Sequence, residues 1–187
     1  MFFQTHWLIG ETVARIAYND EPGSINPRAF SWGCVLPDIA NPYNQIPHTV
    51  KDSYWLFSTL LAQAQAPTFN SGWDFSVHIG MLSHFISDYF CRAHNDPELI
   101  EFVPHAIYET KMLGKANGKK IQKLAASYLQ NERDEISDVH QYLEYKHSCY
   151  LNSPPGPDTD IAYAVEMVLN VALTLLKPKP QNLLRVA

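Results

Sequence analysis

The 187-residue chain has little cysteine, no basic run and no apolar run of membrane-spanning length. Its three cysteines, Cys34, Cys91 and Cys149, are odd in number, far apart and form no CxxC pair. They therefore imply no disulfide framework and no cluster of thiolate ligands. The net charge of −5 and the absence of a basic cluster argue against a dedicated nucleic-acid-binding module. We expect no stable nucleic-acid partner.

The sequence also shows neither a membrane-spanning stretch nor a secretory leader. The longest apolar stretch, residues 161–176, includes three polar side chains and falls short of the ~20 residues that a spanning helix needs. It has the composition of a core helix. The first residues, MFFQTHWLIGE, show no basic leader, no long apolar run and no small-residue cleavage site. These features predict a cytoplasmic protein with no transmembrane segment.

Apolar residues are abundant, at 46% of the chain, and recur with helical spacing. Helices are expected over residues 6–18, 27–34, 50–65, 71–92, 98–113, 119–129, 133–149 and 158–176. Pro37 is expected to end the second helix, and the proline-containing stretch 41–48 is expected to be a loop. There is no strand-like alternation, no internal repeat and no linker between two cores. The sequence predicts one all-α domain, a multi-helix bundle over residues 1–177, followed by a loosely held tail, 178–187.

Two histidine–carboxylate pairs lie on consecutive predicted helices. His84 and Asp88 are four residues apart, and His105 and Glu109 repeat that spacing. Residues four apart share one helix face, and His94 lies in the turn between the two helices. A hairpin of this kind brings nitrogen and oxygen donors together around one cleft. Neutral imidazoles with carboxylates suit Zn²⁺.

A single pair with this spacing is more often a surface pair or a satisfied half-buried histidine. Two pairs on adjacent helices, with a further histidine at the turn, reverse that preference. Three more candidate donors lie upstream in polar or proline-bounded surroundings, namely His6, Asp38 and His48. The remaining histidines have weaker claims: His78 is expected in the core or behind the ligands, and His140 and His147 are expected to be solvated. Cys34 and Cys91 are expected to be buried small apolar residues.

The order of these donors along the chain resembles the zinc-dependent phospholipase C and S1/P1 nuclease superfamily. The matching elements are His6, Asp38, His48, His84-x3-Asp88-x5-His94 and His105-x3-Glu109. The closing HxxxE pair is closer to the phospholipase branch, whereas the short distance from Met1 to His6 is closer to the nuclease branch. The resemblance implies an all-α enzyme that holds two or three zinc ions.

The resemblance also assigns the donors to three metals. The first would be held by Asp38, His48, His84 and Asp88. The second would be held by His94, His105 and Glu109. The third would use His6, with Asp88 bridging to the first. In the family a free terminal amine completes this third site, and Met1 could supply that amine here.

The activity implied by the resemblance is hydrolysis of a phosphodiester, with phospholipid head groups as the expected substrate. A metal-activated water would attack phosphorus, and Asp38 would orient or deprotonate that water. Transient contact with a membrane surface is expected. A single-strand nuclease or 3′-nucleotidase is one alternative, for which aromatic residues would form a base platform, with Phe30, Trp32, Tyr43 and Trp73 as candidates. A non-catalytic metal-binding relative is the other. An HD-type phosphohydrolase is disfavoured because the chain contains no His-Asp dipeptide.

Overall fold

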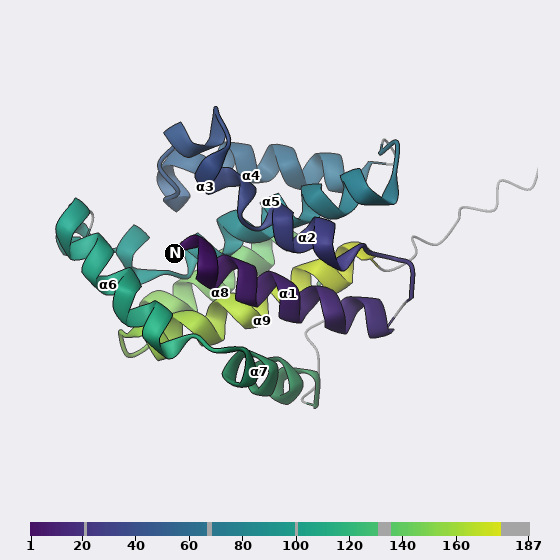
Figure 1. The fold of residues 1–187 in the computed structure, drawn as a ribbon. Coiled ribbons are helices and arrows are strands. Elements are labelled where there is room, and N and C mark those ends of the chain that lie inside the picture. The colour runs from purple at the N-terminus through teal and green to yellow at the C-terminus, as the bar shows by residue number, and fades with distance from the viewer. Residues whose placement is uncertain (21, 67–68, 100, 131–135, 177–187) are drawn as a thin grey trace, which may run out of the picture.

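The computed structural model describes the whole chain except residues 21, 67–68, 100, 131–135 and 177–187. The described residues form α-helices joined by short turns and contain no strand, which confirms the predicted all-α fold (Figure 1). The helices are α1 (Phe3–Asp20), α2 (Pro27–Gly33), α3 (Leu36–Ile39), α4 (Val50–Gln65), α5 (Gly72–Tyr89), α6 (Phe102–Lys115), α7 (Gly118–Gln130), α8 (Val139–Leu151) and α9 (Pro157–Leu176). The predicted domain end at 177 and the tail 178–187 lie outside the described residues.

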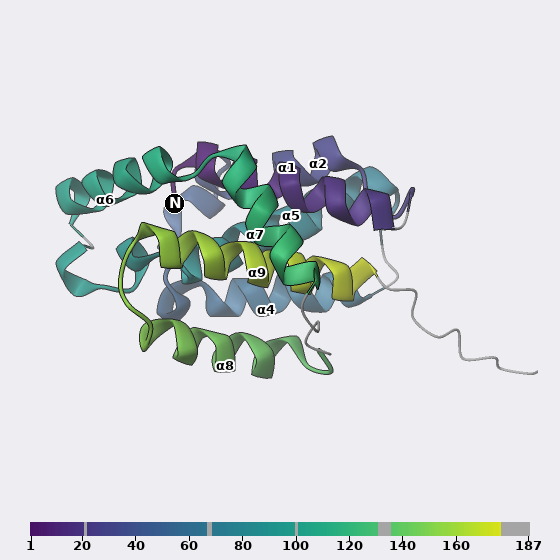
Figure 2. The same ribbon diagram turned by 90° about the horizontal axis from the view of Figure 1, so that it is seen from below.

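Helices α5 and α9 form the centre of the fold (Figures 1 and 2). Helix α5 packs against α2, α4 and α9, and α9 also contacts α1, α6, α7 and α8. Of the described helices, α9 is the one whose length and composition would allow it to cross a membrane, and 61% of its most apolar window is buried inside the fold. A helix covered on several sides by other helices needs apolar residues around most of its circumference.

Two glycines allow α2 and α5 to approach closely. A Cβ atom on Gly33 would lie 2.1 Å from the carbonyl oxygen of Val77, and one on Gly80 would lie 2.2 Å from that of Phe30. Both obstacles are backbone atoms, so no side-chain movement could relieve the clash. This contact holds the segment from α2 to α3 against α5, and Asp38 is therefore brought near the second half of α5.

The helix ends follow local capping chemistry. Asn26 accepts hydrogen bonds from the amides of residues 28 and 29 at the start of α2, next to Pro27 in the first helical position. Ser71 accepts a hydrogen bond from the amide of Asp74 and caps the start of α5. Asp138 caps α8 in the same way.

Several predicted helix ends are wrong. Pro37 does not simply end a helix, because it lies in the first turn of α3, where a missing amide hydrogen costs nothing. The helix expected from residue 98 is divided into a 3-10 turn, Pro97–Leu99, and α6, which begins at Phe102. The helix start expected at residue 133 lies outside the described residues; residues 136–138 are not helical, and α8 begins at Val139. The expected loop 41–48 includes a 3-10 turn, Tyr43–Gln45. The helix expected to reach residue 92 ends at Tyr89.

Candidate metal centre

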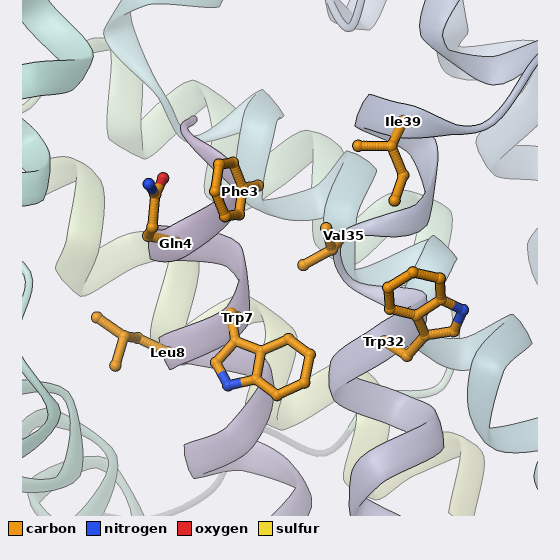
Figure 3. A pocket seen from close by; sticks show the side chains of 7 residues that line it. All are labelled: Phe3, Gln4, Trp7, Leu8, Trp32, Val35 and Ile39. Atoms are coloured by element: carbon orange, nitrogen blue, oxygen red, sulfur yellow. The ribbon is translucent and has the colours of Figure 1, made fainter.

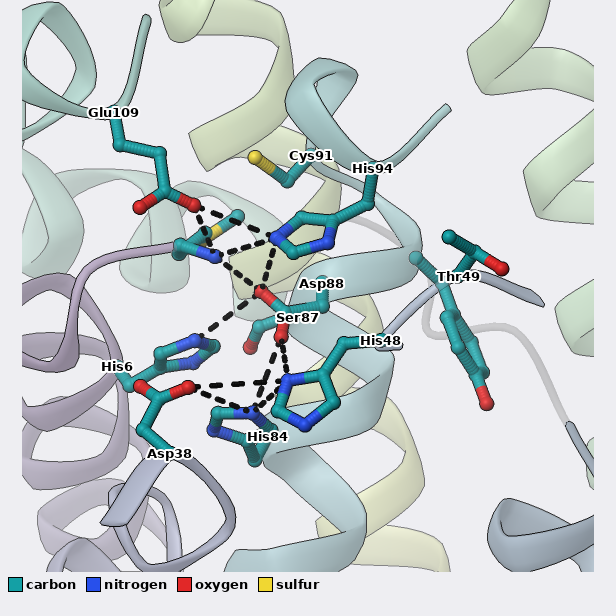
Figure 4. A network of polar contacts seen from close by, with 12 residues as sticks. His6, Asp38, His48, Thr49, His84, Ser87, Asp88, Cys91, His94 and Glu109 are labelled. Atoms are coloured by element: carbon teal, nitrogen blue, oxygen red, sulfur yellow. Dashed lines mark hydrogen bonds and ion pairs between the residues drawn. The ribbon is translucent and has the colours of Figure 1, made fainter. Parts of the chain in front are cut away.

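All eight predicted metal ligands lie in one cluster, although they come from distant parts of the sequence. Figure 4 labels all of them except His105. Helix α5 supplies two of them from its buried C-terminal half, and the others come from α1, α3, the turn before α4, the 3-10 turn Arg92–His94 and α6. They are His6, Asp38, His48, His84, Asp88, His94, His105 and Glu109. The structure thus brings together every residue that the sequence selected, and their role as ligands remains a prediction.

Asp88 lies at the middle of the cluster, and its two carboxylate oxygens face different donors. Oδ2 lies 2.9 Å from Nδ1 of His48 and 3.1 Å from Nε2 of His84. Oδ1 lies 3.2 Å from Nε2 of His6 and 3.3 Å from Nε2 of His94. Burial acts to raise the pKa of Asp88, but the surrounding basic groups, His94 first, outweigh it and hold that pKa well below its ordinary value. Asp88 is therefore a buried anion shared between two sets of nitrogen atoms.

The set around Oδ2 has the character of a cation site. The carbonyl oxygen of Cys34 lies 2.9 Å from Nδ1 of His84, so it accepts a hydrogen bond from Nδ1–H. This fixes the tautomer in which Nε2 carries a lone pair. This lone pair faces Asp38 Oδ1 at 3.6 Å, Asp88 Oδ2 and, at 2.9 Å, His48 Nδ1. Acceptor atoms that converge in this way repel each other unless a cation or a proton lies between them.

The second set lies around Glu109. Its Oε1 is 3.0 Å from Nε2 of His105 and 3.4 Å from Nε2 of His94. The amine of Met1 lies 2.9 Å from the same oxygen, 3.0 Å from His94 Nε2, and also contacts Oδ1 of Asp88. Burial favours a raised pKa for Glu109, yet its hydrogen bonds to His105 and His94 outweigh burial and lower that pKa. The Met1 amine thus lies between the donors assigned to the second metal and Asp88. It makes no hydrogen bond to His6, and its part in a third site stays a prediction.

His6 is buried and unsatisfied. Its ring is stacked on that of His84 at 3.9 Å. Within the described part of the chain Nδ1 has no hydrogen-bond partner, and Nε2 faces Asp88 Oδ1 at 3.2 Å without a well-aligned hydrogen bond. Burial, with a contribution from His84, lowers the pKa of His6 to about 4, so the ring is neutral at pH 7. Buried polar atoms without a partner are rare in native proteins, and a neutral imidazole with a free lone pair is the form that binds a metal.

A family model matches residues 5–153, well over half of the chain. The family is described as zinc dependent phospholipase C. The chain belongs to the zinc-dependent phospholipase C family. This confirms the resemblance seen in the order of the donors. Searches of curated proteins and of solved structures gave no match.

The donor set fits the metal that the zinc-dependent phospholipase C family requires. Two groups of side chains offer ligand atoms that lie within 4.8 Å of one another. The first is His6, Asp38, His84 and Asp88, and the second is Cys91, His94 and Glu109. Imidazole nitrogens mixed with carboxylate oxygens are typical of zinc in hydrolytic sites. The resemblance separates His6 from the first metal, whereas the structure also places it within reach of the first group.

Cys91 lies near the candidate metal centre, although the sequence did not assign it there. It is fully buried, as expected, but its sulfur lies within 4.8 Å of the ligand atoms of His94 and Glu109. Burial raises the pKa of this thiol. The sequence signal for Cys91 is its position three residues before His94. This spacing alone does not predict a place in the centre, because the direction of the Cys91 side chain depends on the turn between them.

The other histidines are structural. His78 is half-buried rather than in the core, and its Nε2 donates to the carbonyl oxygen of Leu60 at 2.8 Å, away from the candidate ligands. The prediction that His140 and His147 are solvated is wrong, because both are half-buried and hydrogen-bonded. His140 Nδ1 lies 3.0 Å from the hydroxyl of Tyr54, and His147 Nε2 lies 2.9 Å from Oδ1 of Asn95. Asn95 in turn donates to the carbonyl oxygens of residues 89 and 91, next to the turn that carries His94.

Proposed function

We propose that this member of the zinc-dependent phospholipase C family hydrolyses phospholipids and releases the phosphorylated head group. The observation that carries the proposal is the pair of donor groups that share the buried carboxylate of Asp88. Such an arrangement suits two or more metal ions held a few ångströms apart, which is the device that phosphodiester hydrolases use to stabilise an in-line displacement. The family match supports the coarser statement of a metal-dependent phosphodiesterase.

Zinc would be held as the resemblance assigns it. The first ion would be bound by Asp38, His48, His84 and Asp88. The second would be bound by His94, His105 and Glu109. A third would be bound by His6, Asp88 and the Met1 amine. Bound zinc supplies a Lewis acid that lowers the pKa of water and neutralises phosphoryl oxygens.

The proposal assigns the proton transfer to Asp38. Its side chain is 26% exposed, whereas those of Asp88 and Glu109 are 0% and 6% exposed. Oδ1 of Asp38 faces His84 and His48, so Oδ2 remains for a water molecule. In the proposed step Oδ2 accepts a proton from the attacking water as its oxygen bonds to phosphorus. The bond from phosphorus to the glycerol oxygen breaks, and that oxygen takes up the proton.

Contact with a membrane surface is part of the proposal. Helix α6, which carries two of the candidate ligands, exposes a row of large apolar side chains at its N-terminal half. Phe102 is 85% exposed, and Val103 and Ile107 are also exposed. Apolar side chains presented together to solvent near a site mark a surface for an apolar partner, and a lipid bilayer is the partner that holds the proposed substrate.

A second candidate function has one observation in its favour. Trp32 and Trp73 are both exposed and line one hollow of about 350 Å³, so they offer a stacking platform for a nucleic-acid base. Tyr43 is half-buried. Phe30, which the sequence also offered for this role, is fully buried and cannot take part. A single-strand nuclease or 3′-nucleotidase therefore remains the competing proposal.

The test compares substrates on zinc-loaded, untagged protein. We expect release of phosphocholine from phosphatidylcholine, and no comparable release of nucleotides from single-stranded DNA or of phosphate from 3′-nucleotides. Asp38→Asn should abolish most of this turnover, whereas Asp52→Asn, an exposed carboxylate on α4, should leave it unchanged. Preferential cleavage of DNA would support the second candidate. Full zinc content without hydrolysis of any phosphodiester would overturn both and leave a non-catalytic relative.

A further inference from the structure

A concave apolar pocket lies between α1 and the segment from α2 to α3 (Figure 3). Its volume is about 550 Å³, within the range of ~300–1,000 Å³ typical of small-molecule sites. It is lined by Phe3, Gln4, Trp7, Leu8, Trp32, Val35 and Ile39. Phe3 and Ile39 lie toward one end of it and the two indole rings toward the other (Figure 3).

The pocket and the candidate metal centre are built on the same short segments. On α1, Phe3 and Trp7 lie on either side of His6 in the sequence. On α3, Ile39 directly follows Asp38, the proposed proton acceptor. Val35 directly follows Cys34, whose carbonyl oxygen holds the ring of His84. Lining residues and candidate ligands are thus sequence neighbours on both α1 and α3, and this shared framework connects the pocket with the metal centre.

The lining selects an uncharged, apolar occupant. No lining residue carries a charge, and Gln4 is the lining side chain with an amide group. A second phosphate would find no cation here. Phe3, Trp7, Trp32 and Ile39 are all exposed. Removing them from water by covering them with hydrocarbon is favourable at ~25 cal/mol per Å² of apolar surface.

We propose that this pocket binds a hydrocarbon chain of the phospholipid while the phosphate lies at the metal centre. The inference rests on the proposed function. It assigns to the pocket the hydrocarbon part of the substrate, which the metal ligands do not contact. Trp7 and Trp32 suit the entrance of such a pocket, because an indole ring offers a broad apolar face and a single polar N–H. Recognition of an acyl chain would favour intact lipids over their water-soluble head groups.

The test measures binding without turnover. Butyl-, hexyl- and octylphosphonic acid, all below their aggregation concentrations, are titrated into zinc-loaded protein by calorimetry; their carbon–phosphorus bond resists hydrolysis. Each added methylene group that enters the pocket should tighten binding about fourfold. Trp7→Ala and, from the opposite wall, Ile39→Gln should each reduce this dependence on chain length. Trp55→Ala is the matched control, since Trp55 is 60% exposed on α4 and lies outside the pocket.

Zinc content is measured for every variant, because Trp7 and Ile39 adjoin candidate ligands. An unchanged chain-length dependence in both pocket variants at full zinc content would overturn the proposal. Tighter binding of a 3′-nucleotide than of octylphosphonic acid would overturn it too, in favour of a base pocket. Hydrolysis of phosphatidylcholine without any chain-length dependence refutes the pocket and leaves the proposed function standing. Chain-length dependence without hydrolysis supports the pocket and refutes the function.

Discussion

Replacing Asp88 with asparagine should weaken zinc binding on both sides of the centre at once. Oδ1 of Asp88 faces His6 and His94, and Oδ2 faces His48 and His84, all within 3.3 Å. Asparagine has almost the same size but carries no charge and presents a single carbonyl oxygen. One side of the centre therefore loses a ligand atom, and both sides lose the anion that offsets the charge of the ions.

The expected size of the effect follows from linkage between binding and folding. Zinc at a hundred times its Kd stabilises the folded chain by about 2.7 kcal/mol per ion. In a chain of this length about 1 kcal/mol raises Tm by roughly 2–4 °C, so each ion adds about 5–11 °C. A hundredfold loss of affinity at the same zinc concentration leaves about 0.4 kcal/mol per ion, so Asp88→Asn should retain roughly 1–2 °C per ion.

Scanning calorimetry of each variant, first with chelator and then with zinc, measures this rise in Tm. The zinc-free form of each variant is its own reference, which separates loss of metal from any loss of intrinsic stability. His94→Gln is the comparison, because His94 touches the Oδ1 side alone and should retain about half of the parent's rise. A rise in Asp88→Asn equal to that of the parent would refute the shared-carboxylate reasoning.

Three further perturbations test separate parts of the account. Asp38→Asn should lower kcat by about 10²–10⁴-fold while changing the free energy of unfolding of the zinc-free chain by less than about 1 kcal/mol, because its carboxylate is partly exposed. Equal losses of activity and of zinc-free stability would contradict a role in proton transfer. Gly80→Ala should destabilise the chain by about 1–3 kcal/mol or more in urea titrations, whereas Gly114→Ala, which meets no atom within 4 Å, should stabilise α6 by up to about 1 kcal/mol. Burial lowers the pKa of His147, so the stability gained by burying the neutral ring is complete above pH 6.5 and is lost as the pH falls through the lowered folded pKa. His147→Gln should therefore lose less stability in that acidic range than the parent does. Identical pH profiles of stability would show that His147 is not buried as described.

The sequence predicts the helical fold and the local ligand pairs because both depend on short-range spacing. His84 with Asp88, and His105 with Glu109, lie one helical turn apart, and this alone places each pair on one helix face. Bringing His6 to His84 is a tertiary event, because the two residues lie 78 positions apart in the sequence. Nothing local in the sequence specifies it, and the resemblance to a family with the same donor order supplied that step.

Other features could not be predicted because they depend on how helices pack. The contact between Gly33 and Gly80 requires knowledge of which two helices touch. The half-burial of His147 depends on its meeting Asn95, 52 residues earlier in the chain. Pro37 is ambiguous for a different reason, because proline can end one helix or begin the next, and the sequence alone does not distinguish the two outcomes.

Elemental mass spectrometry of untagged protein, grown in zinc-replete medium, tests the central claim most directly. The account predicts two or three zinc ions per chain and a large loss of zinc in the double variant His84→Ala, Asp88→Ala. A His78→Ala variant, which removes a histidine outside the cluster, should keep the parent's zinc content. Fewer than one zinc ion per chain in the parent would contradict the proposed centre and, with it, the hydrolase.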